Sequence, residues 1–274
     1  MSIATVILAA GKGTRMNSDI PKVLHPIAGA PMLVHALQAA RSQEPDRMVV
    51  VAGHGAEAVS HAVHGYDEDV RVVVQEEQLG TGHAVQQARA ALDGFDGTVI
   101  VLYGDTPFVR PETLEAMVAA RATQDVVVLG FEAADPGRYG RLKMNGETLD
   151  AIVEFKDATE AERAISLCNS GVVACDAATL FSLLDDVTDN NAAGEFYLTD
   201  IIGLARARGL SAGVVTCPEA ETLGINSRAE LAAADALFQQ TARAAAMEDG
   251  VTLLDPSSIY FSYRLIKISV SIMS

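Results

Sequence analysis

Residues 5–16 read TVILAAGKGTRM and decide the fold, because they join an apolar strand to a glycine-rich loop. The apolar run before the glycines is typical of a strand that is covered on both faces of a parallel sheet. Glycine lets the chain turn tightly and leaves backbone N–H groups open to an anion. The loop region also supplies the cations Lys12, Arg15 and Lys22, and Asp19 is the one acidic residue among them. This local positive charge predicts a small, highly charged anionic substrate, and a nucleoside triphosphate fits.

Two familiar phosphate-binding loops are excluded by their spacing. A P-loop places four residues between its glycines and follows them with Lys-Ser or Lys-Thr, a pattern that is absent here. A dinucleotide-binding loop needs a third glycine, where this chain has Met16, and an acidic residue at the end of the next strand. Residues 49–53, VVVAG, provide no acidic residue. A glycine pair after a strand also occurs in ordinary tight turns, so the loop by itself does not show which ligand, if any, it binds.

Composition narrows the class of protein. The 274 residues carry 36 acidic and 20 basic side chains, a formal net charge of −16, and nucleic-acid binding is not expected because it depends on neutralising phosphates. No apolar run approaches the length of a membrane span, so no membrane partner is expected. The N-terminus lacks a signal-peptide pattern and the three cysteines have no paired spacing. Together these features predict reduced thiols and a cytoplasmic location.

Alternating strand and helix patterns predict an α/β fold with a doubly wound, mixed and mostly parallel sheet. The predicted strands of the first half cover residues 5–8, 47–51, 70–75, 98–103 and 126–131. The predicted helices between them cover residues 32–40, 56–64, 82–91 and 111–120, and they should lie on both faces of the sheet. Ligands of such sheets bind at the carboxyl ends of the strands. The glycine loop, Gln75 and Asp105 are therefore expected at one edge.

The pattern changes after about residue 135. A hairpin is predicted around the turn pair at 145–146, with strands at 142–144 and 151–155. Further elements are expected to extend the sheet: helices at 177–185 and 200–207, and a strand at 212–216. An alanine-rich helix over 227–246, with a serine N-cap, is expected to lead away from the domain.

Seven further strings follow the glycine loop in a specific order. They are 75–84 (QEEQLGTGHA), 102–105 (LYGD), 139–141 (YGR), 152–158 (IVEFKDA), 169–171 (NSG), 194–200 (GEFYLTD) and 224–228 (GINSR). With the loop and Lys22, these strings resemble the N-terminal uridylyltransferase domain of the bacterial bifunctional N-acetylglucosamine-1-phosphate uridylyltransferases/glucosamine-1-phosphate acetyltransferases. The resemblance covers about the first 260 residues. It implies a Rossmann-like fold of the nucleotide-diphospho-sugar transferase type.

The resemblance also implies an activity and its residues. The activity is transfer of the uridylyl group of UTP to N-acetylglucosamine 1-phosphate by metal-assisted in-line attack, giving pyrophosphate and UDP-N-acetylglucosamine for cell-wall and lipopolysaccharide synthesis. Mg²⁺ is the implied cofactor, with Asp105 and Asn226 as its ligands, and Arg15 and Lys22 are the implied catalytic cations. The implied nucleotide-binding residues are Leu8, Ala9, Ala10, Gly11, Gln75, Gly80 and Thr81. The implied sugar-binding residues are Tyr103, Gly104, Gly140, Glu154, Asn169, Tyr197 and Thr199.

The residue types suit these roles. Asp105 follows a buried strand, and Mg²⁺ prefers oxygen donors and often takes one or two of them from protein; a turn aspartate before Pro107 is the alternative. Lys22 and Arg15 would neutralise the triphosphate and its transition state, because phosphoryl-type transfer needs mainly positioning and charge compensation. The attacking sugar phosphate is already largely ionised at neutral pH, with a second pKa of about 6. No general base is therefore needed.

Two polar residues suit recognition of base and sugar. Gln75 carries an acceptor and donors in one amide and can meet the edge of uracil, while Gly80 and Thr81 let backbone approach the base. By its residue type alone, Gln75 is also an ordinary polar strand end. A buried Glu154 carboxylate would accept hydrogen bonds from sugar hydroxyls and reject analogues that lack them. The six histidines show no metal-ligand spacing, and the cysteines are expected in the core.

The end of the chain departs from the family. The family continues into a β-helix of hexapeptide repeats that carries acetyl transfer and builds a trimer, whereas residues 264–274, RLIKISVSIMS, show no such repeat. We expect a nucleotidyltransferase domain over 1–226, a connecting helix over 227–250 and the truncated start of an absent β-helix domain over 251–274. Acetyltransferase activity is then not expected, and a trimer is expected only with the missing domain. A shifted reading frame, or an edge strand that pairs with another chain, is the alternative for the tail.

Two other functions remain open at this point. One is a related sugar-1-phosphate nucleotidyltransferase that uses another sugar or dTTP, against which strings 78–83 and 154–158 argue. The other is a non-catalytic nucleotide-binding fragment. Its case is weakened by the presence of all four residues that the resemblance assigns to the metal and the triphosphate: Arg15, Lys22, Asp105 and Asn226.

Overall fold

The apolar runs of the sequence form the strands of one large sheet. The computed structural model describes residues 2–263. Its strands are β1 (Ile3–Ala9), β2 (Pro26–Ile27), β3 (Ala30–Pro31), β4 (Arg47–Ala52), β5 (Arg71–Val74), β6 (Thr98–Tyr103), β7 (Val126–Glu132), β8 (Arg141–Asn145), β9 (Thr148–Val153), β10 (Leu167–Asp176) and β11 (Ala212–Thr216). Its α-helices are α1 (Met32–Arg41), α2 (Ala56–Tyr66), α3 (Thr81–Gln87), α4 (Pro111–Ala120), α5 (Glu160–Arg163), α6 (Ala177–Leu184), α7 (Asp200–Ala207) and α8 (Arg228–Glu248). The short 3₁₀ helices are η1 (Thr14–Met16), η2 (Lys22–Leu24), η3 (Ala90–Leu92), η4 (Glu219–Thr222) and η5 (Pro256–Ser258).

The strand order confirms the predicted sheet. Within residues 2–263, a nine-stranded sheet runs in the order β11-β7-β10-β6-β1-β4-β5, with β8 paired to β10 and β9 paired to β8. Strand β1 is parallel to both β6 and β4, β4 is parallel to β5, and β7 is parallel to β11. Strand β10 is antiparallel to both β6 and β7. The sheet is therefore mixed and mostly parallel.

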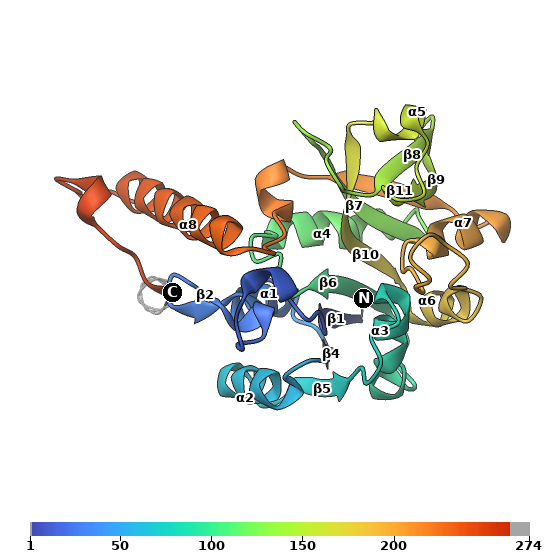
Figure 1. Cartoon of the computed structure of the whole chain (residues 1–274), viewed down its shortest axis with the longest axis horizontal. Coiled ribbons are helices and arrows are strands. Elements are labelled where there is room, and N and C mark those ends of the chain that lie inside the picture. The colour runs from blue at the N-terminus through green and yellow to red at the C-terminus, as the bar shows by residue number, and fades with distance from the viewer. Residues whose placement is uncertain (1, 264–274) are drawn as a thin grey trace.

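Helices cover both faces of this sheet, as the alternating pattern predicts (Figure 1). Side chains of β1 alternate between the faces: Val6 and Leu8 join the core under α3, α6 and α7, whereas Ile7 and Ala9 join the core under α1, α2 and α4. Such alternation follows from the two-residue repeat of a strand. Because both faces are buried, the sequence of β1 is a continuous apolar run.

Strand β10 is the longest strand that was not predicted from the sequence. The second half of the chain does extend the sheet, through β11 at its edge, but β10 inserts into the middle of the sheet between β6 and β7. Its register against β7 shifts between Asn169 and Val173, and Gly171 within this interval has φ +95°. This is a β-bulge, which bends the strand and re-aims its side chains. The polar string at the bulge hides the strand, because it interrupts the apolar pattern.

Helix α8 extends from the sheet toward the C-terminal end of the described chain (Figure 1). Ser227 caps it, and its reciprocal hydrogen bonds with Glu230 form a capping box, which confirms the predicted serine cap. The chain then returns: the Tyr263 N–H donates to the Ala28 oxygen at 2.9 Å. The predicted boundaries at 226 and 250 remain a proposal, and the tail at 264–274 lies outside the described residues.

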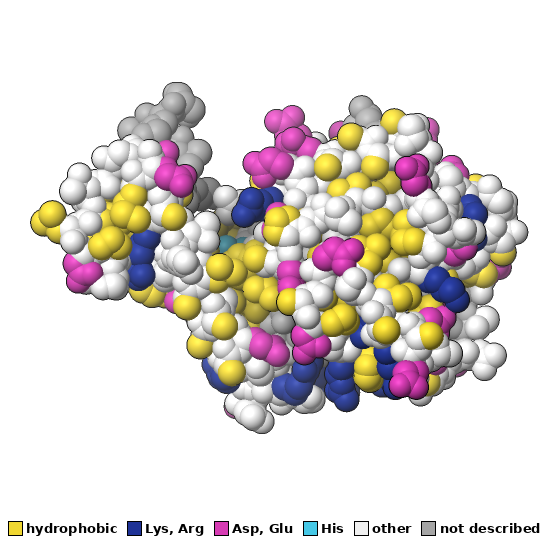
Figure 2. Space-filling model, turned by 90° about the horizontal axis from the view of Figure 1, so that it is seen from above, with side chains coloured by type: hydrophobic (Ala, Val, Ile, Leu, Met, Phe, Trp, Pro, Cys, Tyr) yellow, Lys and Arg dark blue, Asp and Glu magenta, His cyan; other side chains and the backbone are white. Residues whose placement is uncertain are grey.

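The surface carries both signs of charge. On the face shown in Figure 2, acidic and basic side chains are interspersed among apolar ones. Within residues 2–263, no helix combines the length and the apolar character that a membrane crossing requires.

Candidate active site

The glycine-rich loop leaves the carboxyl end of β1 and lies against Lys22. Gly13 has φ +60°, in the left-handed region, and a Cβ at this position would lie 2.5 Å from the Lys22 Cβ. Only glycine permits both the backbone conformation and this approach. The loop is thereby held against the start of η2, with the residues before it, Leu8, Ala9 and Ala10, buried and Gly11 exposed.

A Gly13→Ala variant tests this contact, with Gly146→Ala as its matched control. Gly146 has φ +62°, but no atom lies within 4 Å of a Cβ there. Both variants are expected to lose about 1 kcal/mol of unfolding free energy to the left-handed backbone. Gly13→Ala should lose about 1–3 kcal/mol more, because its methyl group meets Lys22. Chemical denaturation measures the difference, and equal losses would contradict the contact.

Lys22 lies between two side-chain oxygens from distant parts of the chain. Its ammonium donates to Oδ2 of Asp105, in an ion pair, and to Oδ1 of Asn226 at 3.0 Å. Asp105 follows β6 at the carboxyl end of the sheet, and Asn226 precedes α8. The Lys22 and Asp105 side chains are 11% and 18% exposed, so their interaction is only weakly screened by water. Three of the predicted catalytic and metal-binding residues therefore meet at one point.

Backbone contacts hold the two oxygens in place. The Ile225 N–H donates to the Asp105 carbonyl oxygen at 3.0 Å. The Asn226 N–H donates to Glu230 Oε2 at 2.6 Å, so the capping box of α8 also fixes the residue that precedes it. The start of α8 thus positions Asn226 beside Asp105.

The donor set suits a hard divalent cation. Asp105 and Asn226 present one carboxylate and one amide oxygen, and both converge on a single cationic atom, the Lys22 ammonium. Mg²⁺ prefers oxygen ligands, and it is commonly bound by one or two protein groups together with substrate phosphates. These two side chains therefore offer oxygen ligands of the kind that Mg²⁺ takes from protein.

Arg15 and Arg228 occupy different parts of this region. Arg15 is exposed on η1, two residues after Gly13. Arg228 is the first residue of α8, and its Nε donates to the Met16 carbonyl oxygen at 3.1 Å. It ties the end of η1 to α8. Arg228 belongs to the string at 224–228, but its role was not predicted from the sequence.

A second loop follows β5 and pairs with a segment far along the chain. Gly80 has φ +118°, and a Cβ there would lie 2.5 Å from the Phe196 carbonyl oxygen. The Phe196 N–H donates to the Leu79 oxygen, and the Phe196 oxygen accepts from the Gly82 N–H, both at 2.8 Å. The Thr81 hydroxyl accepts from the Leu198 N–H at 3.0 Å. The close approach at Gly80 is thus made by protein backbone, and it joins the predicted base loop to the predicted sugar segment.

Tyr103 and the β10 bulge lie side by side. A Cβ at Gly171 would lie 2.6 Å from the Tyr103 ring, so the ring packs directly on this glycine. Burial raises the pKa of the Tyr103 hydroxyl, and the negative charges of Glu154 and Asp105 act in the same direction. Tyr103 therefore stays neutral. The neighbouring Gly104 N–H donates to the Leu8 oxygen at 2.9 Å, which joins the ends of β6 and β1.

Four predicted sugar-binding residues are linked by short contacts. The Thr199 hydroxyl donates to Glu154 Oε1 at 3.2 Å. A Cβ on Gly140 would lie 3.4 Å from the same oxygen, and the Gly140 carbonyl accepts from the Asn169 N–H at 2.8 Å. Burial raises the pKa of the Glu154 carboxyl, opposed by the hydrogen bond from Thr199. This carboxylate is therefore partly desolvated and ready to accept hydrogen bonds.

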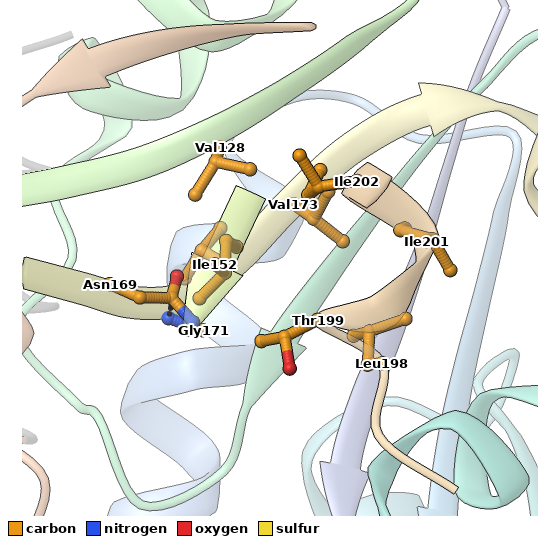
Figure 3. Close-up of a pocket in the computed structure, with 10 residues that line it drawn as sticks. Val128, Ile152, Asn169, Gly171, Val173, Leu198, Thr199, Ile201 and Ile202 are labelled. Atoms are coloured by element: carbon orange, nitrogen blue, oxygen red, sulfur yellow. Dashed lines mark hydrogen bonds between the residues drawn. The ribbon is translucent and has the colours of Figure 1, made fainter. Parts of the chain in front are cut away.

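A small, mostly apolar cavity adjoins these residues (Figure 3). Two polar side chains line it, Asn169 from β10 and Thr199 from the start of α7. Its other lining residues are Val128, Ile152, Gly171, Val172, Val173, Leu198, Ile201 and Ile202. Tyr197 precedes this segment, and burial raises the pKa of its hydroxyl, as do the charges of nearby carboxylates. The cavity thus brings apolar side chains together with two hydrogen-bonding side chains, Asn169 and Thr199.

Some residues of this region carry no prediction from sequence. Gly171, Phe196 and His83 shape the loops described above, and each falls within one of the quoted strings. The strings therefore marked these segments without indicating the contacts that these three residues make within the protein.

A family comparison decides what kind of domain this is. The model of the MobA-like NTP transferase domain matches residues 5–186, from β1 into the turn after α6. The chain belongs to this family. The match includes the glycine loop, Lys22, Asp105 and Glu154, whereas Asn226 lies beyond it.

Curated relatives match this NTP transferase chain beyond residue 186. It is 66% identical over 263 residues to the "Bifunctional protein GlmU" of Roseobacter denitrificans, and 65% identical over 262 residues to that of Ruegeria pomeroyi. Each alignment covers 96% of this chain and 58% of the relative. The chain thus spans less than two thirds of the length of these relatives.

Solved structures show the same fold. A UDP-glucose pyrophosphorylase complexed with UDP-glucose matches with a TM-score of 0.71 and 20% identity, over 88% of this chain and 100% of that chain. An inositol-1-phosphate CTP transferase from T. maritima matches with a TM-score of 0.66 and 17% identity, over 85% and 95%. These likenesses confirm the Rossmann-like fold of nucleotidyltransferases for this NTP transferase chain.

Proposed function

We propose that this chain transfers the uridylyl group of UTP to N-acetylglucosamine 1-phosphate, giving UDP-N-acetylglucosamine and pyrophosphate. The observation that carries the proposal is the convergence of Asp105 and Asn226 on the Lys22 ammonium, beside the glycine loop. This arrangement can hold a triphosphate and its metal where the strands end. The high identity to GlmU proteins and the NTP transferase family support the reaction class.

The proposed cofactor is a divalent metal, and specifically Mg²⁺, held by Asp105 and Asn226. When bound, the ion supplies a positive charge that offsets the negative charge developing on the phosphates. Lys22 is proposed to turn from these oxygens to the triphosphate, and Arg15 to bind the same phosphates from η1. Such transfer depends on positioning and charge compensation. These residues therefore need only to hold the phosphates in line and to offset their charge.

The remaining predicted residues are proposed to hold base and sugar. Gln75 and the loop at 80–81 would receive uracil, while backbone at Leu8, Ala9, Ala10 and Gly11 would face the nucleotide. Glu154 would accept hydrogen bonds from sugar hydroxyls, supported by its raised pKa and its contact with Thr199. The other proposed sugar contacts are Tyr103, Gly104, Gly140, Asn169 and Tyr197.

A cytoplasmic location is proposed together with this activity. Cys168, Cys175 and Cys217 are free thiols in the structure. Reduced thiols and a nucleoside triphosphate substrate both suit the cytoplasm.

Glu154→Gln is expected to weaken sugar-phosphate binding and to stabilise the folded protein. The KM for the sugar phosphate should rise by about tenfold or more, because a charged acceptor is lost. The pKa of the Glu154 carboxyl is raised in the folded state. The protonated carboxyl therefore favours folding, and this contribution to the unfolding free energy is lost as the pH rises above the ordinary carboxyl range. The variant should therefore gain stability relative to the wild type between pH 4.5 and neutral pH. Denaturation at several pH values measures this gain, with exposed Glu147→Gln as control; a relative loss would contradict the assignment.

A pyrophosphate-release assay across substrates tests the proposed function. The purified chain is supplied with UTP, CTP or dTTP and with N-acetylglucosamine, glucosamine or glucose 1-phosphate, in the presence of Mg²⁺ or a chelator. We expect the highest kcat/KM for UTP with N-acetylglucosamine 1-phosphate, and no release with the chelator. A preference for another pair would favour a related nucleotidyltransferase. Nucleotide binding without release would favour a non-catalytic fragment.

A further inference from the structure

The orientation of the Gln75 side chain is fixed by two acceptors. Its amide nitrogen lies 3.1 Å from the Gly80 carbonyl oxygen and 3.0 Å from Nδ1 of His83. A carbonyl oxygen can only accept, so the Gln75 group that faces it must be the NH₂ and not the oxygen. One amide hydrogen goes to Gly80, and the other goes to His83 when Nδ1 of its ring carries no hydrogen. Both donors of Gln75 are therefore used inside the protein.

The amide oxygen of Gln75 is left to meet a ligand. Within residues 2–263, this Oε1 accepts no hydrogen bond, and it is not among the buried side-chain polar atoms that lack a partner. It therefore keeps some access to solvent, although the residue as a whole is 3% exposed. The Gln75 N–H donates to the Ala52 oxygen at 2.8 Å, which places the residue at the carboxyl end of the sheet.

Because Oε1 of Gln75 can only accept, it favours a base that presents a hydrogen-bond donor to it. Uracil presents the ring N3–H, which can donate to Oε1 of Gln75. Cytosine has an unprotonated N3, and its lone pair would face the lone pairs of Oε1. Such a like-against-like contact rejects the wrong partner by repulsion and by leaving polar groups unpaired.

We propose that His83 is a positioning residue, which holds Gln75 in this orientation and makes the site select a pyrimidine base with a ring N–H donor. The inference rests on the proposed transfer from a uridine nucleotide. Without the His83 acceptor, only the Gly80 oxygen would restrain the amide. The Gln75 side chain could then turn and present its NH₂ to the N3 of cytosine.

The contact with Gln75 requires one form of the His83 ring. A neutral imidazole carries one hydrogen, so Nδ1 accepts only when the hydrogen is on Nε2. The Gln87 amide nitrogen lies 3.2 Å from Nε2 and 3.0 Å from the His83 carbonyl oxygen. Because that carbonyl oxygen can only accept, the Gln87 group that faces it is the NH₂. Both residues lie on α3, one helical turn apart.

The experiment compares variants of His83 with and without an acceptor. His83→Phe and His83→Leu remove it, while His83→Asn restores one, because the Asn Oδ1 can take the place of Nδ1. The exposed His61→Leu on α2 is the control. For each folded variant, calorimetry gives the Kd for UTP and for CTP, and the pyrophosphate assay gives the two kcat/KM values.

The readout is the preference for UTP over CTP, calculated from the two Kd values and from the two kcat/KM values. A merely structural role of His83 would weaken the binding of both nucleotides alike. We expect a ratio reduced by about tenfold or more in His83→Phe and His83→Leu, and retained in His83→Asn and His61→Leu. An unchanged ratio in either acceptor-free variant, or a ratio lost equally in His83→Asn, would overturn the inference. Wild-type binding that does not distinguish UTP from CTP would overturn it too. Selective binding without pyrophosphate release would instead refute the proposed transfer and leave the role of His83 in place.

Discussion

Asp105→Asn is expected to lower kcat by about a hundredfold or more and to leave the fold in place, because it removes the only carboxylate proposed to hold the metal. The substitution keeps the shape of the side chain and one oxygen. It removes the negative charge that faces the Lys22 ammonium and, in the proposed reaction, the divalent cation. A pyrophosphate-release assay at saturating Mg²⁺ measures the loss, and circular dichroism reports the fold.

Asp93→Asn is the matched control for this variant. Asp93 is exposed and lies before β6, at the opposite end of the strand from Asp105. It should retain wild-type turnover. Near-normal turnover by Asp105→Asn would remove Asp105 from the metal site, and equal losses in both variants would show a general effect of charge.

Lys22→Met is expected to lower turnover by about a hundredfold or more, because a cation that offsets phosphate charge is lost. The apolar stem is retained, so packing against Gly13 changes little. The variant also leaves the Asp105 carboxylate without its partner at a largely buried position, which should reduce the unfolding free energy by about 3 kcal/mol or more. Mg²⁺ should restore part of this stability, because the ion can occupy the position between Asp105 and Asn226.

Two controls separate these effects. The exposed Lys12→Met, on the same loop, should change neither stability nor its response to Mg²⁺. The double variant Lys22→Met/Asp105→Asn should be more stable than Lys22→Met, because no unpaired charge remains. If Mg²⁺ shifts the melting temperature of Lys22→Met no more than that of the wild type, the two oxygens do not form its site.

Elements with a strong apolar pattern could be predicted closely from sequence. Strand β6 and helices α4 and α7 occupy the predicted residues, because buried strands read as apolar runs and helices repeat every three to four residues. Strand β10 could not be predicted, since its bulge places polar residues and Gly171 within the strand. Its central position comes from pairing with β6 and β7, and such long-range pairing leaves no local signal.

The candidate site was predictable in part for the same reason. The carboxyl ends of parallel strands meet at one edge, so Asp105 and the glycine loop could be placed together. Asn226 lies 204 positions from Lys22 in the chain, and its expected place came from the family resemblance alone. The pairing of Gly80 with Phe196 joins two irregular segments, which carry no periodic pattern. Side-chain partners such as His83 and Gln75 likewise required the structure.

The central claim is a single in-line transfer at the site formed by Lys22, Asp105 and Asn226. The configuration at phosphorus tests it most directly, with UTP that carries sulfur at one stereochemically defined α-position as the substrate. The account predicts a thio analogue of UDP-N-acetylglucosamine with inverted configuration, as one direct displacement requires. Retained configuration would contradict it by showing a covalent enzyme intermediate, and the absence of any sugar nucleotide, with UTPαS and with UTP alike, would contradict the transfer itself.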